Sequence, residues 1–427
     1  MQLDLAILAD DLTGAADTGL QLAKRGYRTH VSFAVPAPAD ADVLVIDTDS
    51  RICPAPEAAR RVATAARWLR TVEPRYVYKK IDSTGRGNLG AEIEAALGAL
   101  GISCALVCPA FPAVGRTVRD GRILIHGVSL DRTEFADDPL WPAATASIAD
   151  LLRAQTDAAT ACLPLAVIRQ GCDAVRAWLA RVRQSGVRVV IADAETDADL
   201  QCLAALASAA GPDLLLVGSA GLAAWLMPDR DRTAVPLSPI TLAAGPILIV
   251  AGTLNRRGIE QIRYIVGQGA CYVPLDLEHL RASSDKAIIE MARDLRTMLG
   301  RADHVVLGLV DRLDEPFDAR RLVKAWGADP IEIARRLVAA LGQVTRRAIE
   351  ERSPAALVLT GGDTARAVVL ALGAGGIEIR EEVAPGVPAG IIEQGPWHGL
   401  PLVTKAGGFG PPEALAVVLE RLEERRR

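Results

Sequence analysis

A chain of 427 residues exceeds the size of one ordinary hydrophobic core, so its length predicts two or three domains. Half of the residues are hydrophobic and the formal net charge is −4, a composition that favours a globular protein and disfavours a nucleic-acid binder, which usually carries a basic surface. The seven cysteines include no CxxC pair and the five histidines no HxxxH pair, so we expect reduced thiols rather than a disulfide framework or a zinc site.

Strand-like and helix-like stretches alternate along the whole chain, which predicts an α/β fold with largely parallel sheets. In the first half we expect strands over 5–8, 29–33, 43–47, 75–81, 104–108, 165–168, 187–191 and 214–217, and helices over 15–26, 57–70 and 91–100. The polar, glycine-punctuated stretch 111–139 is too long for an idle connection, so we expect a functional loop there.

A charged and then proline-containing segment over 228–244 interrupts the alternation and predicts a linker between domains. We place the first domain at 1–230, the linker at 231–245 and the second domain at 246–427. In the second domain we expect strands over 246–250, 304–309, 356–359 and 400–404, and helices over 256–268, 285–299, 330–351 and 412–424.

Two adjacent carboxylates, Asp10 and Asp11, follow the first expected strand and precede a helix. In open α/β sheets, ligands bind at the carboxyl ends of strands. Either residue could simply cap the helix, but one acid would be enough for that. Two acids repel a phosphate and suit a hydroxyl-rich ligand, a metal ion or a proton that is to be removed. This turn therefore predicts a ligand site.

The turn 48–51 ends in Arg51, which can be read as an ordinary polar turn or as a guanidinium fork for a carboxylate. The turn 79–90 offers donors for an anionic ligand from Lys80, Ser83, Thr84 and Arg86, with Asp82 beside them; the alternative is a solvated turn.

Gly85, Gly87 and Gly90 in the same turn also match the GxGxxG pattern of a dinucleotide site. No acid follows at the distance that a ribose contact requires, and the preceding strand ends in charge, so this reading is the weaker one. It nevertheless keeps an NAD-dependent dehydrogenase open as an alternative.

Arginines and acids alternate with glycine over 115–121 and recur over 127–136, which fits either a solvated loop or a lid that forms a second wall of the site. In the second domain, glycine-bearing turns over 252–255, 360–364 and 405–410 each follow an apolar strand. Each alone could be a plain turn, but together they predict a cradle of backbone amides for phosphates. None is a Walker A loop.

Taken together, these stretches resemble the four-carbon acid sugar kinase family, whose members phosphorylate tetronates such as threonate, erythronate or their oxo forms. The resemblance covers nearly the whole chain and rests on ADDLTGAADTG, TDSR, KKIDSTGRGN, PAFPAVGRTVRDG, VGSAGL, LTGGDTA, APGVPAG and TKAGGFG in this order. It implies two Rossmann-like α/β domains with the active-site cleft between them. Residues 1–230 would bind the acid sugar and residues 246–427 would bind ATP. The chain departs from the family pattern at Gly85 and in the turn 252–255.

The resemblance implies a role for each motif. The substrate-binding residues would be Asp10, Asp11, Arg51, Lys80, Asp82, Ser83, Thr84 and Arg86. The ATP-binding residues would be Thr253, Asn255, Gly361, Gly362, Asp363, Thr364, Gly407 and Gly408. Asp11 and Lys80 are the expected catalytic residues, with Asp11 as the base and Arg51 on the substrate carboxylate. Mg²⁺ would bridge the β- and γ-phosphates near Asp363, and no protein ligand of the metal is assigned.

The expected function is therefore ATP-dependent phosphorylation of D-threonate, D-erythronate or an oxo-tetronate in sugar-acid catabolism. A non-catalytic sugar-acid sensor is the main alternative. We expect no nucleic-acid or membrane partner, because no apolar run reaches the length of a membrane span and the first residues lack a basic signal-peptide region. A cytoplasmic protein is expected, and the Ala/Leu-rich helices are compatible with a homodimer.

Overall fold

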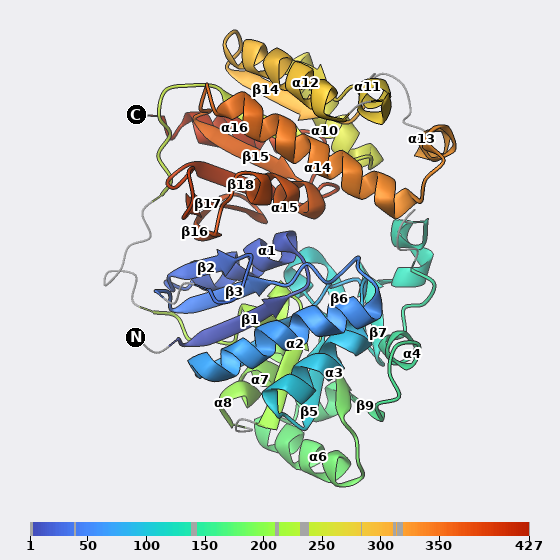
Figure 1. Ribbon diagram of the computed structural model, residues 1–427. Helices are drawn as coiled ribbons and strands as arrows, with labels where there is room; N and C mark the ends of the chain where they lie inside the picture. The colour runs from blue at the N-terminus through green and yellow to red at the C-terminus, as the bar shows by residue number, and fades with distance from the viewer. Residues whose placement is uncertain are drawn as a thin grey trace. The chain divides into compact units, whose positions relative to one another are not determined.

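The computed structural model describes residues 3–37, 40–137, 143–209, 213–230, 239–282, 284–310, 313 and 319–426. Its internal contacts divide the chain into two compact units, Met1–Pro236 and Leu237–Arg427. Each unit has strands in the middle and helices packed around them, as Figure 1 shows. Of the expected linker 231–245, residues 231–238 lie outside the described ones.

The first unit is built on a parallel sheet with the strand order β2–β3–β1–β4–β11–β5–β10–β9. Its strands are β1 (Leu5–Ala9), β2 (Thr29–Ser32), β3 (Val43–Asp47), β4 (Tyr76–Lys80), β5 (Cys104–Cys108), β9 (Thr160–Leu163), β10 (Val189–Ala192) and β11 (Leu214–Gly218). The inner strands are buried along their whole length, since helices cover both faces of a parallel sheet. This confirms the prediction of an α/β fold with largely parallel sheets.

Two groups of helices pack around this sheet. The helices are α1 (Leu12–Ala23), α2 (Ala55–Val72), α3 (Leu89–Leu100), α4 (Ile148–Arg153), α5 (Leu165–Ile168), α6 (Cys172–Gln184), α7 (Asp197–Ala204), α8 (Leu206–Ala209) and α9 (Ala220–Ala223). Helix α2 packs against α3, and α1 and α7 both pack against α9. Helices α1 and α3 directly follow β1 and β4, so their N-termini lie at the ends of those strands.

The strand expected over 165–168 is wrong: these residues form α5, and the strand is β9, five residues earlier. A four-residue apolar run does not distinguish a strand from a buried helical turn.

The loop expected over 111–139 is partly wrong, because its described part, 111–137, contains a small antiparallel sheet of β6 (Arg116–Arg119), β7 (Arg122–Ile125) and β8 (Val128–Ser129). Asp120 and Gly121 connect β6 to β7 with φ values of 51° and 66°. Two consecutive residues in the left-handed region are the signature of a tight hairpin turn, and Asp-Gly is a preferred sequence for it. The short helices η1 (Pro112–Val114), η2 (Leu130–Arg132) and η3 (Glu134–Asp137) complete this segment.

The second unit has the strand order β13–β14–β12–β15–β18–β17–β16. Its strands are β12 (Ile247–Ala251), β13 (Cys271–Pro274), β14 (His304–Gly308), β15 (Ala356–Thr360), β16 (Gly376–Ala384), β17 (Val387–Glu393) and β18 (Pro401–Lys405). The sheet is parallel from β13 to β18, and β17 then pairs antiparallel with both β18 and β16. The β16–β17 hairpin was not predicted, because the charged residues of β16 hide its alternation of buried and exposed positions.

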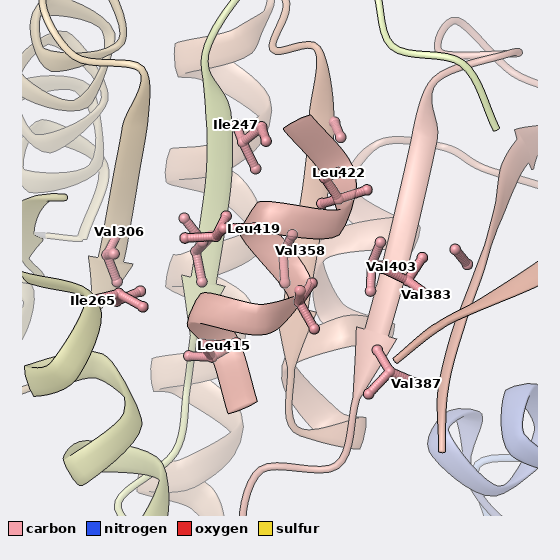
Figure 2. Close-up of a cluster of buried hydrophobic side chains, with 14 of the residues drawn as sticks. Ile247, Ile265, Val306, Val358, Val383, Val387, Val403, Leu415, Leu419 and Leu422 are labelled. Atoms are coloured by element: carbon pink, nitrogen blue, oxygen red, sulfur yellow. The ribbon is translucent and has the colours of Figure 1, made fainter. Parts of the chain in front are cut away.

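The hydrophobic core of the second unit lies between this sheet and helices α10 and α16. The helices of the unit are α10 (Arg256–Gly267), α11 (Leu277–Ala282), α12 (Ser284–Leu299), α13 (Ala319–Trp326), α14 (Pro330–Ile349), α15 (Gly362–Ala371) and α16 (Ala414–Glu423). Figure 2 shows Leu415, Leu419 and Leu422 of α16 facing Ile247 and Val358 of the sheet. Helices α12, α14 and α15 pack in a second group. In neither unit does a helix of the described part of the chain have the length and hydropathy needed to cross a bilayer.

Candidate active site

Four neighbouring strands of the first unit, β3, β1, β4 and β11, end at the same edge of the sheet. The register pairs Ala9, the last residue of β1, with Asp47 on one side and Lys80 on the other, and it pairs Lys80 with Gly218. The polar residues that follow these strands are therefore brought together at the edge where open α/β sheets bind ligands.

The guanidinium of Arg51 holds both carboxylates of the first motif. Its Nε and Nη2 donate to Asp10 at 2.8 and 2.9 Å, and its Nη1 and Nη2 donate to Asp11 at 2.6 and 2.7 Å. Asn88 fixes the turn that carries the arginine, because its amide donates to the carbonyl oxygens of Ser50 and Cys53. Arg51 was expected to be a fork for the substrate, and in the structure this fork is filled by the protein's own acids.

The two carboxylates have different pKa values because their surroundings differ. Burial raises the pKa of Asp10, but the charges of Arg51 and Lys80 outweigh it and the net shift is downward. Burial raises the pKa of Asp11, Arg51 opposes it, and the negative charge of Asp10 contributes to a net upward shift. Oδ1 of Asp11 also accepts a hydrogen bond of 2.9 Å from the backbone amide of Gly14, in the first turn of α1. Asp11 is thus the more basic of the pair, which suits a proton acceptor.

Lys80 and Lys79 point to opposite faces of β4, as consecutive residues of a strand must. The buried Lys80 side chain passes beside Gly14, where a Cβ atom would lie 2.6 Å from Nζ of Lys80 and 2.6 Å from Oδ1 of Asp11. Lys79 is fully buried on the other face, 2.7 Å from the carboxylate of Glu92 on α3, and it donates to the backbone oxygen of Lys80 at 2.7 Å. The second lysine therefore supports the backbone from which the first one reaches the site.

Asp82 organises the turn after β4. Its carboxylate accepts from the backbone amide and the hydroxyl of Thr84 and from Nε of Arg86 at 2.9 Å. Burial alone would raise the pKa of Asp82, but Arg86 and Arg51 hold it well below its usual range. Asp82 is therefore a permanent carboxylate that orders its own turn.

The small sheet of β6–β8 contacts the turn after β4, a position that fits the reading of 115–121 as a second wall of the site. Its Arg116 donates to the hydroxyl of Ser83, and the guanidinium lies over the ring of Phe135 at 5.7 Å from the ring centroid. The motif was recognised in the sequence, but Arg116 was not among the expected site residues. Asp17 on α1 was missed as well: burial raises its pKa, and Lys80 and Arg116 act on it electrostatically. In the sequence, Asp17 could have been recognised as the third acid of ADDLTGAAD.

The glycines of the GxGxxG match are packed against the protein. A Cβ atom on Gly85 would lie 2.8 Å from Leu151, and one on Gly90 would lie 2.8 Å from Gln155. In a dinucleotide fingerprint the second glycine must be open to the pyrophosphate, but a Cβ atom on Gly87 would lie 3.1 Å from Cγ of Arg51. The dehydrogenase alternative is therefore wrong for this turn.

In the second unit, the adjacent strands β12, β15 and β18 end at one edge, and their register pairs Ala251 with Thr360 and Thr360 with Lys405. The three glycine-bearing turns consequently meet. A Cβ atom on Gly407 would lie 3.2 Å from Oγ1 of Thr253 and 3.8 Å from Cα of Gly361.

The remaining expected nucleotide residues surround this meeting point. Asn255 caps α10 by accepting from the amide of Arg257 at 2.8 Å, and its side chain lies next to Gly408. Gly362 and Asp363 begin α15, and a Cβ atom on Gly252 would collide with Oγ1 of Thr364. Two helix N-termini therefore open at this edge, which is a geometry that favours phosphate.

Lys405 is buried at the end of β18, where its ammonium donates to the carbonyl oxygen of Ala406 at 2.9 Å. Burial lowers its pKa to about 8. No ion pair of this lysine is found with any residue in the described ranges. A buried cation without a protein anion is suited to an anionic group of a ligand.

Among the described residues, no three His, Cys, Asp or Glu side chains come together as a metal cluster. Mg²⁺ in nucleotide sites is usually held by phosphates with one or two carboxylates rather than by a protein cage. The exposed Asp363 in the first turn of α15 fits that arrangement.

Sequence comparison assigns a family description to each unit. The profile described as "Sugar-binding N-terminal domain" matches residues 5–226, and the one described as "Nucleotide-binding C-terminal domain" matches residues 248–415. A D-threonate kinase of Salmonella typhimurium is 37% identical, with 99% of both chains covered. A D-erythronate kinase of Heliobacterium modesticaldum is 33% identical, and a 3-oxo-tetronate kinase of Burkholderia multivorans is 32% identical; each alignment covers 98% of this chain and 97% of the relative.

Among solved structures, a protein of Salmonella typhimurium LT2 matches with a TM-score of 0.80 at 25% identity, over 99% of this chain and 100% of the other. A Haemophilus influenzae protein matches with a TM-score of 0.70 at 24% identity, over 98% of this chain and 100% of the other. The fold is therefore shared along the whole chain.

Proposed function

This chain belongs to the four-carbon acid sugar kinase family, and from that premise we propose that it transfers the γ-phosphoryl group of ATP to a hydroxyl group of a tetronate. The enzyme class follows directly: it is a phosphotransferase with an alcohol group as acceptor. The observation that carries the proposal is the pairing of Asp10 and Asp11 with Arg51 at the strand edge of a unit that matches a sugar-binding family.

In the proposed mechanism, Asp11 accepts the proton of the attacking hydroxyl. Its raised pKa supports this role, because a proton acceptor needs more basicity than a carboxylate that is fully neutralised. Arg51 opposes the upward shift of the Asp11 pKa and fixes the orientation of the carboxylate. Lys80, whose ammonium lies beside Asp11, stabilises negative charge on the attacking oxygen. The side chains of Asp10, Asp82, Ser83, Thr84 and Arg86 complete the substrate site.

The nucleotide is assigned to the second unit. We propose that Thr253, Asn255 and the amides of Gly361, Gly362, Gly407 and Gly408 bind its phosphates. The first four lie at two helix N-termini, and the last two lie beside Thr253 and Asn255. Lys405 contributes a positive charge, and Thr364 and Asp363 lie in the first turn of α15. Asp363 would hold Mg²⁺ together with the nucleotide, and the metal would supply positive charge that neutralises the phosphates.

The substrate is one of the tetronates named for the relatives, D-threonate, D-erythronate or a 3-oxo-tetronate. The identities of 37%, 33% and 32% are too close to choose among them. All seven cysteines are free thiols, which supports the proposal that the protein works in the cytoplasm. A homodimer stays a prediction.

A coupled assay of ADP release tests the function, with D- and L-threonate, D- and L-erythronate and their 3-oxo derivatives as acceptors. We expect turnover with at least one of them and none without acceptor. Binding of a tetronate without any ADP release would contradict the kinase and favour the sugar-acid sensor.

A further inference from the structure

Some of the arginines at the strand edge of the first unit are hydrogen-bonded to carboxylates of the protein, and one is not. Arg51 donates to Asp10 and Asp11, and Arg86 donates to Asp82. The donors of these two arginines are directed to carboxylates that belong to the protein. Neither is therefore the first choice for a further carboxylate from a ligand.

Arg116 differs from both. Its Nη1 donates to the hydroxyl of Ser83, and its guanidinium lies over the face of Phe135. No carboxylate oxygen in the described ranges lies within ion-pairing distance of it. At Arg116 burial outweighs the nearby acids and lowers the pKa, whereas at Arg51 and Arg86 the neighbouring acids outweigh burial and raise it. The guanidinium of Arg116 is thus a partly buried cation held by a hydroxyl and an aromatic face.

We propose that Arg116 binds the carboxylate of the sugar acid and makes the enzyme select acids over neutral sugars. This inference rests on the proposed function and names the residue that recognises the charged end of its substrate. A guanidinium can bind a carboxylate with two parallel hydrogen bonds. With Nη1 on Ser83, Nε and Nη2 remain for such a bidentate contact.

The small sheet holds Arg116 in place from behind. Val118, two residues along β6, forms a bridge with Ala194, and the carboxylate of Asp193 accepts from the amides of Gly121 at 2.9 Å and Asp120 at 3.1 Å. Asp193 and Ala194 directly follow β10, a strand of the main sheet. The hairpin is therefore fixed to the main sheet at its turn, while Arg116 lies at the end that reaches Ser83.

Asp17 and Lys80 support this placement. Both Lys80 and Arg116 act electrostatically on Asp17, so the three groups share one region of the site. Asp82 and Glu134 also act on Arg116 electrostatically, but the hydrogen bond of its guanidinium goes to the hydroxyl of Ser83, so a substrate carboxylate can still pair with it directly.

The test measures ADP release by wild type, Arg116→Ala and Arg116→Lys with the best tetronate and with its carboxamide, which has the same hydroxyl groups and no charge. We expect Arg116→Ala to raise the KM for the acid by about 10- to 100-fold, since a charge-assisted hydrogen-bond pair is lost. The KM values for the carboxamide and for ATP should change by less than about 3-fold. Added methylguanidinium should partly restore the activity of Arg116→Ala with the acid.

Arg119→Ala is the matched control, because Arg119 lies on the same strand with its side chain 58% exposed and pairs with Glu195. It should leave both KM values unchanged. Equal loss for acid and carboxamide in Arg116→Ala would overturn the proposal, as would a loss of acid preference in Arg51→Ala but not in Arg116→Ala. If wild type releases no ADP with any tetronate, the proposed function fails instead. Calorimetric titration of the tetronate into wild type and Arg116→Ala then decides on Arg116 separately.

Discussion

Nη1 of Arg51 lies 2.6 Å from Oδ2 of Asp11, so the arginine after β3 and the N-cap of α1 form one largely buried ion pair. The two residues are 40 positions apart in sequence and belong to neighbouring strand ends. A base that is held by a guanidinium keeps a fixed orientation. Its proton affinity then comes from burial and from Asp10.

The first prediction concerns this base. Asp11→Asn keeps the size of the side chain but removes the proton acceptor, so kcat should fall by about 10²- to 10⁴-fold. ATP binding, measured by calorimetry, should remain within about 3-fold of wild type. Asp173→Asn, at a 93% exposed position on α6, is the control and should have wild-type kcat. Near-normal turnover of Asp11→Asn would remove Asp11 from the role of base.

The second prediction concerns acid stability. The pKa of Asp82 is lowered in the folded protein, so its pairing with Arg86 and Arg51 stabilises the fold above the unfolded-state pKa of about 3.9. This contribution is lost as the pH falls through the lower pKa of the folded state. Asp82→Asn should cost on the order of 3 kcal/mol at pH 7, because it leaves a buried guanidinium unpaired, and less at about pH 3, below the unfolded-state pKa. Urea unfolding of wild type and variant at both pH values measures the difference, and a cost that is independent of pH would contradict the assignment.

The third prediction concerns Lys405. Because burial lowers the pKa of its ammonium to about 8, the positive charge is present at pH 7 and is progressively lost above pH 8. The KM for ATP should therefore rise between pH 7 and pH 9, while Lys405→Met should have a raised KM that does not vary over this range. Deprotonation also relieves the cost of burying the charge, so the free energy of unfolding should increase from pH 8 towards pH 10 in wild type only. A pH-independent KM in wild type would show that Lys405 does not face the nucleotide.

The fourth prediction uses two helical glycines. A Cβ atom on Gly14 would lie 2.6 Å from both Nζ of Lys80 and Oδ1 of Asp11, whereas one on Gly98 in α3 would meet nothing within 4 Å. Alanine favours a helix over glycine by about 1 kcal/mol, so Gly98→Ala should be slightly more stable and fully active. Gly14→Ala should lose at least about 10-fold in kcat because the two catalytic side chains must move. Equal activity of the two variants would contradict the placement of Lys80.

The sequence predicted the inner strands well, because β1, β3, β5 and β12 are continuous apolar runs between polar turns. It failed where this signal is weak. The four apolar residues of α5 are too few to show a helical or a strand periodicity. The charged residues of β16 conceal the alternation that is typical of a strand. The hairpin turn at Asp120–Gly121 was readable from its dipeptide but was treated as part of a loop.

The site was predictable to the extent that strand ends could be recognised. The residues after β1, β3 and β4 do meet at one edge, since parallel order brings them there. The contacts among these side chains could not be predicted from the sequence, because the composition of a turn does not determine where its side chains point. Arg51 was therefore expected to bind the substrate, although it pairs with Asp10. Arg116 was not among the expected site residues, because the strand that carries it was not predicted.

The buried ion pair of Lys79 and Glu92 limits which substitutions these two positions tolerate. Both side chains are almost completely buried, at 0% and 2% exposure, and removing one partner would leave a charge without compensation in the interior. Replacing both with apolar residues of similar volume costs far less. Positions 79 and 92 should therefore change together or remain as they are, and a deep mutational scan should find that most single replacements at either position are harmful while some double replacements are tolerated.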